Sequence, residues 1–269
     1  MAPSPNNSGS TRPSSLWSLL LVGVLAGLFS GVLGVGGGIV MVPLMVGMLR
    51  FDQHRAHATS LAAIVLIAIS GVGRFAFDGE VDWAVGLALG VGGVVGSTLG
   101  AHWMNRLSPT ALRAVFGAII VLAGVRMIFS GDPGLGQQPD PVVGAIIGVL
   151  IGLVAGVASG LAGIGGGVVM VPAMVFLLGL PQHAAEGTSL LAILFTSVAG
   201  TRVNLKNERV DLKEAAIIGA AGILSAQLGA AIALAMSAPR LSQLFGAFVI
   251  LVGIRMLASV YRARRTSGS

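Results

Sequence analysis

Ten apolar stretches alternate with short polar or glycine-rich connections along the chain, and this pattern predicts an all-α integral membrane protein. Most stretches have about 20 residues, the length that a helix needs to cross a hydrocarbon layer about 30 Å thick. The segments are predicted at 16–34, 37–49, 58–76, 82–103 and 111–130, and again at 141–163, 166–179, 187–205, 213–236 and 241–260.

The second segment of each half is shorter than its neighbours. About 13 residues at about 1.5 Å per residue reach only about 20 Å, which is less than the thickness of the hydrocarbon layer. These short segments begin within two glycine clusters, Gly34–Gly38 and Gly163–Gly167. We therefore expect each half of the chain to contain a glycine-broken short helix.

The two halves are related by an internal repeat. When the chain is shifted by 129 residues, positions 26–130 align with 155–259 without a gap, and 41 of the 105 pairs are identical, about 39%. Two glycine-rich stretches can resemble each other by chance, but a gapless match of this length favours a duplicated unit. We predict two repeats of about five helical segments each.

The distribution of basic residues indicates that the repeats have inverted topology. Loops 50–57 and 104–113 carry arginines, whereas loop 77–82 carries only acidic residues. The bias is reversed in the second half, where loop 180–186 has no base and stretch 202–213 has four. Because cytoplasmic loops are enriched in Lys and Arg, both termini are predicted to be cytoplasmic, and corresponding loops face opposite sides.

These features divide the chain into five parts. Residues 1–15 are predicted to form a disordered cytoplasmic N-terminal tail, because they are polar and rich in Pro and Ser. The first transmembrane repeat is 16–130, and a Gly- and Pro-rich linker at 131–140 leads to the second repeat at 141–260. Residues 261–269 form a basic cytoplasmic tail. The expected location is the cytoplasmic (inner) membrane.

Composition supports the membrane assignment and excludes several classes of site. Hydrophobic residues make up 55% of the 269 positions and charged residues 10%, whereas soluble domains have about 25% charged residues. No cysteine is present, which excludes disulfides, thiolate metal sites and iron–sulfur clusters, and we expect no metal or other cofactor. The net charge of +6 is explained by cytoplasmic loops and the C-terminal tail, so no nucleic acid partner is inferred.

The glycine clusters are the predicted substrate site. The short helix after each cluster begins in the membrane interior, where its free N–H groups and partial positive charge would bind a small anion without a buried cation. In inverted-repeat transporters, broken helices at corresponding positions mark the binding site. The alternative is that these glycines only allow helices to cross closely, as small residues at four-residue spacing do elsewhere in the chain.

Several hydroxyl groups complete the predicted site. Ser30 and Ser159 precede the two glycine clusters, while the Thr-Ser pairs at 59–60 and 188–189 open the third segments, where helix N-capping is an equally weighted alternative. The predicted substrate-binding residues are Ser30, Gly34, Gly36, Gly37, Gly38, Thr59, Ser60, Ser159, Gly163, Gly165, Gly166, Gly167, Thr188 and Ser189.

Six basic residues are predicted to act in gating or coupling. The two histidines are placed in loops, where they would bind an anion or relay protons, or be merely solvated. The four arginines lie near segment ends, where they would attract anions or extend to lipid headgroups. These residues are His54, His183, Arg74, Arg202, Arg126 and Arg255.

The acidic residues bear on the type of cargo. All ten are predicted to lie outside the centres of the apolar segments. Because pumps and cation antiporters commonly keep a carboxylate within the membrane, this pattern favours an anion pathway and argues against metal-ion transport.

The repeated pattern G-x-x-G-x-G-G-G-x-x-x-x-P resembles the TauE/SafE family of sulfite exporters (DUF81). It begins at Gly31 with Pro43 in the first half and at Gly160 with Pro172 in the second, and each copy is followed by His-x-A-x-x-T-S-L. The resemblance covers nearly all of 16–260. It implies an inner-membrane carrier for a small sulfur oxyanion.

These arguments lead to one hypothesis and two alternatives. The hypothesis is a secondary transporter, with export as the expected direction, that moves sulfite or an organosulfonate by alternating access. The first alternative is a channel-like pore or a carrier for another small anion such as a carboxylate. The second, an integral-membrane enzyme, is disfavoured because no catalytic set lies at membrane depth. The expected partners are the small anion and the lipid bilayer, and the oligomeric state, including a homo-oligomer, is left open.

Overall fold

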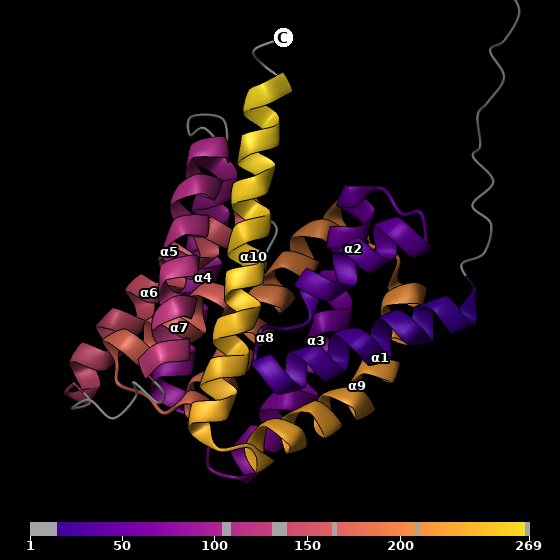
Figure 1. Ribbon diagram of the computed structural model, residues 1–269. Helices are drawn as coiled ribbons and strands as arrows, with labels where there is room; N and C mark the ends of the chain where they lie inside the picture. The colour runs from indigo at the N-terminus through magenta and orange to yellow at the C-terminus, as the bar shows by residue number, and fades with distance from the viewer. Residues whose placement is uncertain (1–14, 104–108, 131–138, 163–165, 208–209, 267–269) are drawn as a thin grey trace, which may run out of the picture.

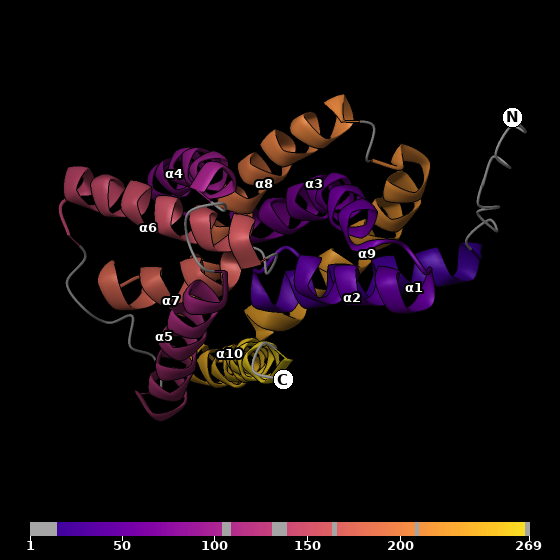
Figure 2. The same ribbon diagram turned by 90° about the horizontal axis from the view of Figure 1, so that it is seen from above.

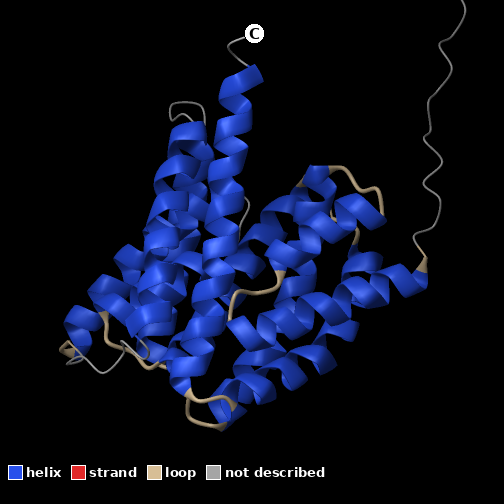
Figure 3. Cartoon of the chain, in the orientation of Figure 1, coloured by secondary structure: helices blue, strands red, loops and turns tan. Residues whose placement is uncertain are grey.

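The computed structural model describes residues 15–103, 109–130, 139–162, 166–207 and 210–266. This part of the chain forms ten helices and no strand (Figures 1 and 3). The helices are α1 (Leu16–Leu33), α2 (Gly38–Met48), α3 (Gln53–Phe77), α4 (Trp83–Trp103), α5 (Pro109–Ser130), α6 (Pro141–Ala162), α7 (Gly167–Leu177), α8 (Gln182–Lys206), α9 (Leu212–Ala235) and α10 (Ala238–Thr266).

The lengths and composition of these helices identify a multi-pass membrane protein. Seven of the described helices are long and apolar enough to cross a membrane, namely α1, α3, α5, α6, α8, α9 and α10. Helices α2 and α7 have 11 residues each, which gives a length of about 16 Å. The predicted all-α fold and its two short helices are therefore confirmed.

Helices from the two halves of the chain are interleaved. Helix α1 packs along α9, α6 packs along α4, and α5 packs along α10 (Figures 1 and 2). Helices α3 and α8 also contact each other near the middle of the structure. Each of these pairings joins the first half to the second. Helix α6 is the equivalent of α1 in the second half, and α9 is the equivalent of α4, so the α1–α9 and α6–α4 pairings correspond to each other.

Glycines allow the paired helices to approach closely. A methyl group built on Gly23 of α1 would lie 2.3 Å from the carbonyl oxygen of Ile218 on α9. The same contact recurs 129 residues later, where a methyl group on Gly152 of α6 would lie 2.2 Å from the carbonyl oxygen of Leu89 on α4. Real side-chain atoms do not approach so closely, so backbone contact between these helices requires glycine.

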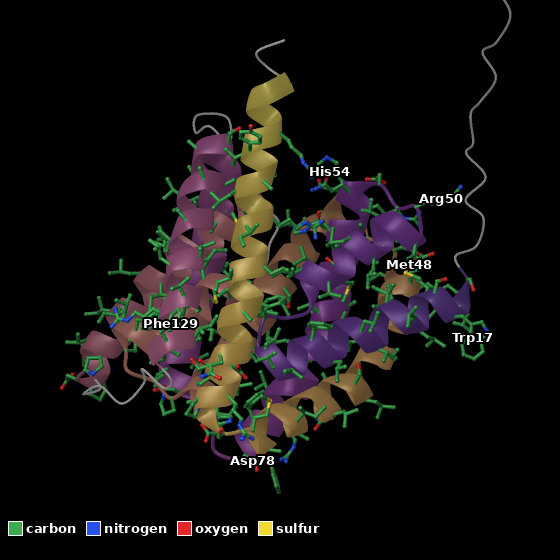
Figure 4. The ribbon with its side chains drawn as sticks, in the orientation of Figure 1. Trp17, Met48, Arg50, His54, Asp78 and Phe129 are labelled. Carbon is green, nitrogen blue, oxygen red and sulfur yellow. The ribbon has the colours of Figure 1, made fainter. Side chains whose placement is uncertain are left out.

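The two ends of α3 lie at opposite ends of the molecule. Figure 4 shows His54 near the start of this helix and Asp78 directly after it, at the other end. Loops 50–57 and 77–82 are thus separated, as the topology prediction requires. The inverted relation of the repeats and the side that faces the cytoplasm remain predictions.

Helices α3 and α8 each begin five residues earlier than predicted. Their first turns are polar, so the apolar pattern alone did not include them. Asp52 caps α3, and its Oδ1 accepts hydrogen bonds from the backbone N–H groups of His54 and Arg55, each at 3.0 Å. The hydrogen bond from the Arg55 backbone N–H to Asp52 is the main cause that lowers the pKa of the Asp52 carboxyl. Helix α8 begins after Pro181 at Gln182.

This extension overturns two predictions. His54 and His183 lie in the first turns of helices rather than in loops. The Thr-Ser pairs at 59–60 and 188–189 lie inside α3 and α8, so helix N-capping is wrong for them. At the other end of the chain, α10 continues to Thr266 and includes part of the predicted basic tail. Residues 1–14 and 131–138, from the predicted N-terminal tail and linker, lie outside the described residues.

Candidate anion-binding site at the glycine breaks

The first glycine break follows α1 and turns the chain into α2. Gly34 ends α1 with φ of 64°, and its N–H donates to the carbonyl oxygen of Ser30 at 2.8 Å. Gly36 and Gly37 also have positive φ, at 76° and 72°. L-residues with side chains rarely adopt this conformation, whereas glycine adopts it freely. The sequence of the break therefore dictates where α1 ends and α2 begins.

The N-terminus of α2 has no side chain to cap it. The N–H groups of Val40 and Met41 donate to the carbonyl oxygen of Gly37, at 3.1 and 2.9 Å, and no side chain accepts a capping hydrogen bond. The N–H groups of Gly38 and Ile39 thus begin the helix, where they carry part of the positive end of its dipole. Such an end attracts a small anion.

Helix α7 begins in a similar way at the second break. The N–H groups of Val169 and Met170 donate to the carbonyl oxygen of Gly166, at 3.1 and 2.9 Å, and no side chain caps α7. Gly166 has φ of −64°, unlike Gly37 at the equivalent position. The predicted site residues Gly163 and Gly165 lie outside the described residues.

The two breaks meet each other. A methyl group built on Gly167, the first residue of α7, would lie 2.7 Å from Cα of Val35 and 3.0 Å from the carbonyl oxygen of Gly34. The start of α7 therefore packs directly on the loop that leads into α2. This places two glycine breaks, 129 residues apart in sequence, at one place in the fold.

Two isoleucines cover the breaks, and sequence reasoning did not identify them. Cδ1 of Ile64 on α3 lies 3.2 Å from a methyl group built on Gly38, and Cδ1 of Ile193 on α8 lies 3.0 Å from one built on Gly167. The two contacts are equivalent under the 129-residue shift. An isoleucine within an apolar helix carries no distinguishing sequence signal, so only the fold reveals its position.

Two of the predicted serines have buried hydroxyl groups that lack a partner. Ser30 is 1% exposed and Ser189 is 0% exposed, and within the described chain neither hydroxyl has a hydrogen-bond partner. Ser30 lies one turn before Gly34. Because an unsatisfied buried polar group costs about 1–3 kcal/mol, these hydroxyls favour a ligand that supplies the missing hydrogen bond. Ser159 is half-buried on α6.

The other predicted hydroxyl residues make contacts within the protein. Thr188 Oγ1 accepts a hydrogen bond from the backbone N–H of Asp82 at 2.9 Å, and Thr59 Oγ1 accepts one from Asp211 at 3.2 Å. Both threonines thus hold the start of a helix from the other half, α4 or α9. Ser60 donates to the carbonyl oxygen of His57 at 2.8 Å.

The predicted gating histidines lie at the start of α3 and α8. His54 is exposed, and Figure 4 shows it at the outer end of α3. Nε2 of His183 lies 3.1 Å from the carbonyl oxygens of both Ala233 and Met236, at the end of α9. His183 therefore anchors the end of a helix.

Three of the four predicted arginines, Arg74, Arg126 and Arg202, lie near helix ends, whereas Arg255 lies inside α10 because this helix continues to Thr266. Arg74 forms an ion pair with Asp78, and the guanidinium of Arg126 lies 4.8 Å from the ring centroid of Phe176. Arg202 and Arg255 are exposed. Among the described residues, no recorded contact of these arginines or of the two histidines reaches the glycine breaks.

A buried acidic residue, Glu186, packs on the first break through its backbone and Cβ. Glu186 is 0% exposed in the second turn of α8. Its Cβ would lie 2.8 Å from a methyl group built on Gly34, and its Oε1 accepts a hydrogen bond from Nε2 of Gln182 at 2.8 Å. Position 186 was predicted in a loop, whereas it lies in α8, near the start of the helix and outside its centre. The repeat offered a signal, since the equivalent residue, His57, is also ionisable.

Comparison with known proteins places the chain among membrane transporters. The family model for "Sulfite exporter TauE/SafE" matches residues 1–127 and 148–269. A "Probable membrane transporter protein" from Xylella fastidiosa (strain 9a5c) is 29% identical over 240 residues, covering 87% of this chain and 92% of the relative. The "Probable membrane transporter protein YunE" of Bacillus subtilis is 28% identical over 262 residues, covering 89% and 96%.

The helical fold and these matches define a multi-pass membrane transporter. The chain belongs to the TauE/SafE family, as the repeated glycine pattern led us to expect.

Proposed function

We propose that the protein is a secondary transporter that carries a small sulfur-containing anion, such as sulfite or an organosulfonate, across the cytoplasmic membrane. The meeting of the two glycine breaks carries this proposal, because the start of α7 contacts the loop that leads into α2. Both short helices begin at this place without side-chain caps. Their N–H groups and dipoles bind an anion with no need for a buried cation.

The substrate site is formed by the glycine breaks and by buried hydroxyls on the helices that contact them. The breaks provide Gly34 and Gly36–Gly38 from the first half and Gly163 and Gly165–Gly167 from the second. Ser30 and Ser189 donate the hydrogen bonds that their hydroxyls lack in the protein, and Ser159 is the equivalent of Ser30. Thr59 and Thr188 support the site indirectly, since their hydroxyls hold α9 and α4.

Transport proceeds by alternating access, in which the breaks open to one side of the membrane at a time. Ile64 and Ile193 pack on the breaks, and in this proposal they close the site between its two openings. Export is the expected direction, and both termini face the cytoplasm. A channel-like pore would instead give flux that does not saturate and is not stimulated by substrate on the far side.

Sulfite uptake into proteoliposomes tests the proposal. Ser30→Ala and Ser189→Ala should each raise the KM for sulfite about tenfold, because a hydrogen bond to a charged group contributes about 1.5–3 kcal/mol. Ser97→Ala is the matched control, since the Ser97 hydroxyl donates to Val94 within its own helix. Acetate and sulfoacetate as competitors distinguish a sulfur anion from a carboxylate. An unchanged KM in both variants would contradict the site, and no anion flux in the wild type would contradict the function.

A further inference from the structure

The Glu186 carboxyl is buried, and it forms no ion pair with the residues that the structure describes. The ion pairs recorded among the described residues join Arg55 to Asp211 and Glu214, and Arg74 to Asp78. None of these pairs includes Glu186, whose Oε2 also lacks a hydrogen-bond partner in this part of the chain. An isolated carboxylate in an apolar interior costs far more free energy than a neutral carboxyl. The buried group is therefore expected to hold a proton.

Helix α1 and the loop before α4, which pack on Glu186 and Gly187, carry no cationic residue. Helix α1 has no ionisable residue, and it ends at Gly34, which packs on Glu186. The loop before α4 packs on the next residue, Gly187, through the backbone oxygen of Glu80.

Three other ionisable groups on these elements, Asp78, Asp82 and His183, have partners of their own. On that loop, Asp78 pairs with Arg74, and the Asp82 carboxylate accepts from the N–H of Val85. On α8 itself, Nε2 of His183 lies at the carbonyl oxygens that end α9. Proton release from Glu186 therefore requires water to reach it, as occurs when a transporter opens to one side.

Gly34 connects this carboxyl to the proposed anion site. A methyl group built on it would meet Glu186, and its carbonyl oxygen would meet a methyl group on Gly167 at the start of α7. An anion at the breaks would lie close to the carboxyl and would repel its ionised form. Because coupling free energies are reciprocal, a proton on Glu186 then favours binding of the anion.

We propose that Glu186, together with Gln182, is the proton-binding site of the transporter and that one proton moves in the same direction as each anion. Export is then driven by the outward concentration gradient of the anion, because an acidic exterior opposes it. The proton binds to a carboxylate oxygen of Glu186 from water on one side and is released to water on the other, so no other bond changes. This inference rests on the proposed function, and it adds the coupling ion. The equivalent residue in the first half, His57, is half-buried, so the two halves differ in the group at this position.

Proton movement during anion flux tests this site. Wild-type protein in proteoliposomes, with the membrane potential clamped, should change the internal pH when sulfite or sulfoacetate enters. Part of this pH change comes from protons that the anion itself carries, and the remainder is due to Glu186. Glu186→Gln should abolish only this remainder, because glutamine mimics a carboxyl that never releases its proton. Exchange of labelled anion for unlabelled anion should persist in this variant.

A pH gradient gives the size of the effect. A difference of one pH unit corresponds to about 1.4 kcal/mol. When the outside of the vesicles is one pH unit more acidic than the inside, wild-type protein should therefore accumulate about tenfold more sulfoacetate inside the vesicles than Glu186→Gln does. Glu80→Gln, a carboxyl on the loop next to α8, is the matched control and should behave as the wild type.

The outcomes separate this proposal from the transport function. No anion flux in the wild type contradicts the function. Wild-type flux with proton coupling equal to that of Glu186→Gln overturns the proton site. If the variant does not fold, wild-type protein alone decides, because the infrared band of a protonated carboxyl should change when sulfoacetate is added. No change in that band overturns the proposal.

Discussion

The two halves of the protein are alike where they hold the fold together and differ where an ionisable group faces a break. The contact of Gly23 with Ile218 recurs as that of Gly152 with Leu89, and each threonine hydroxyl reaches the helix start of the other half. At the start of the third helices, however, half-buried His57 corresponds to fully buried Glu186. The duplicated scaffold thus sets the packing, while single substitutions make the halves chemically different.

The breaks themselves differ in backbone conformation. Gly37 caps α2 with φ of 72°, whereas Gly166 caps α7 with φ of −64°. The two equivalent glycines at the starts of α2 and α7 therefore adopt different backbone conformations. Since glycine accepts both conformations at little cost, a break of this kind can change its turn as the transporter moves.

The largest predicted effect concerns the close packing of α1 on α9 and of α6 on α4. Gly23→Val and Gly152→Val should each abolish recovery of folded protein in detergent, because even a methyl group would lie within 2.3 Å of a backbone oxygen. Gly73→Val is the control, since nothing lies within 4 Å of a methyl group there. Size-exclusion profiles measure the loss. A strong effect at only one of the two positions would show that the pairings are not equivalent.

The isoleucine covers provide the next test. Ile193 packs on Gly36 of the first break and Gly167 of the second, whereas Ile64 packs on Gly36 and Gly38 of the first break alone, so Ile193→Ala should open the breaks more than Ile64→Ala does. In the cysteine-free chain, Ser30→Cys supplies a single buried thiol. Its reaction with a water-soluble thiol reagent should speed up about tenfold in the Ile193→Ala background. Ile67→Ala is the control, because Ile67 is equally buried but contacts Gly222. Equal rates in all backgrounds would contradict a covering role.

Sequence reasoning predicted the helices and the breaks because both have strong local signals. The apolar stretches placed all ten described helices, and the glycine clusters placed the short α2 and α7. It missed the polar first turns of α3 and α8, since hydrophobicity alone does not show where a capped helix begins. The environment of Glu186 depends on contacts between residues 34 and 186, which no local pattern reports.

The threonine contacts predict a moderate and equal effect in the two halves. Thr59→Val and Thr188→Val each remove the acceptor of a partly buried backbone N–H, that of Asp211 or Asp82. Each should lower the free energy of unfolding by about 1–3 kcal/mol, measured by denaturant titration in micelles. Thr98→Val is the control, because the Thr98 hydroxyl is exposed and bonds within its own helix. If the two variants lost different amounts of unfolding free energy, the two halves would differ in the contacts that hold the fold together as well.

The smallest predicted effect concerns the starts of α3 and α8, which are capped differently. Asp52 accepts two N–H groups at the start of α3, whereas Pro181 provides no side-chain cap for α8. The Asp52 pKa is lowered from 3.8 in the folded protein, so its contribution is present above that pH and is lost as the pH falls through the folded value. Amide-exchange protection of His54 and Arg55 should therefore drop by a few-fold in acid, while the first turn of α8 should not change. Asp52→Asn should keep the cap and remove the pH dependence, since asparagine caps helices without titrating. An equal response of both helix starts to acid would show that Asp52 does not account for the difference.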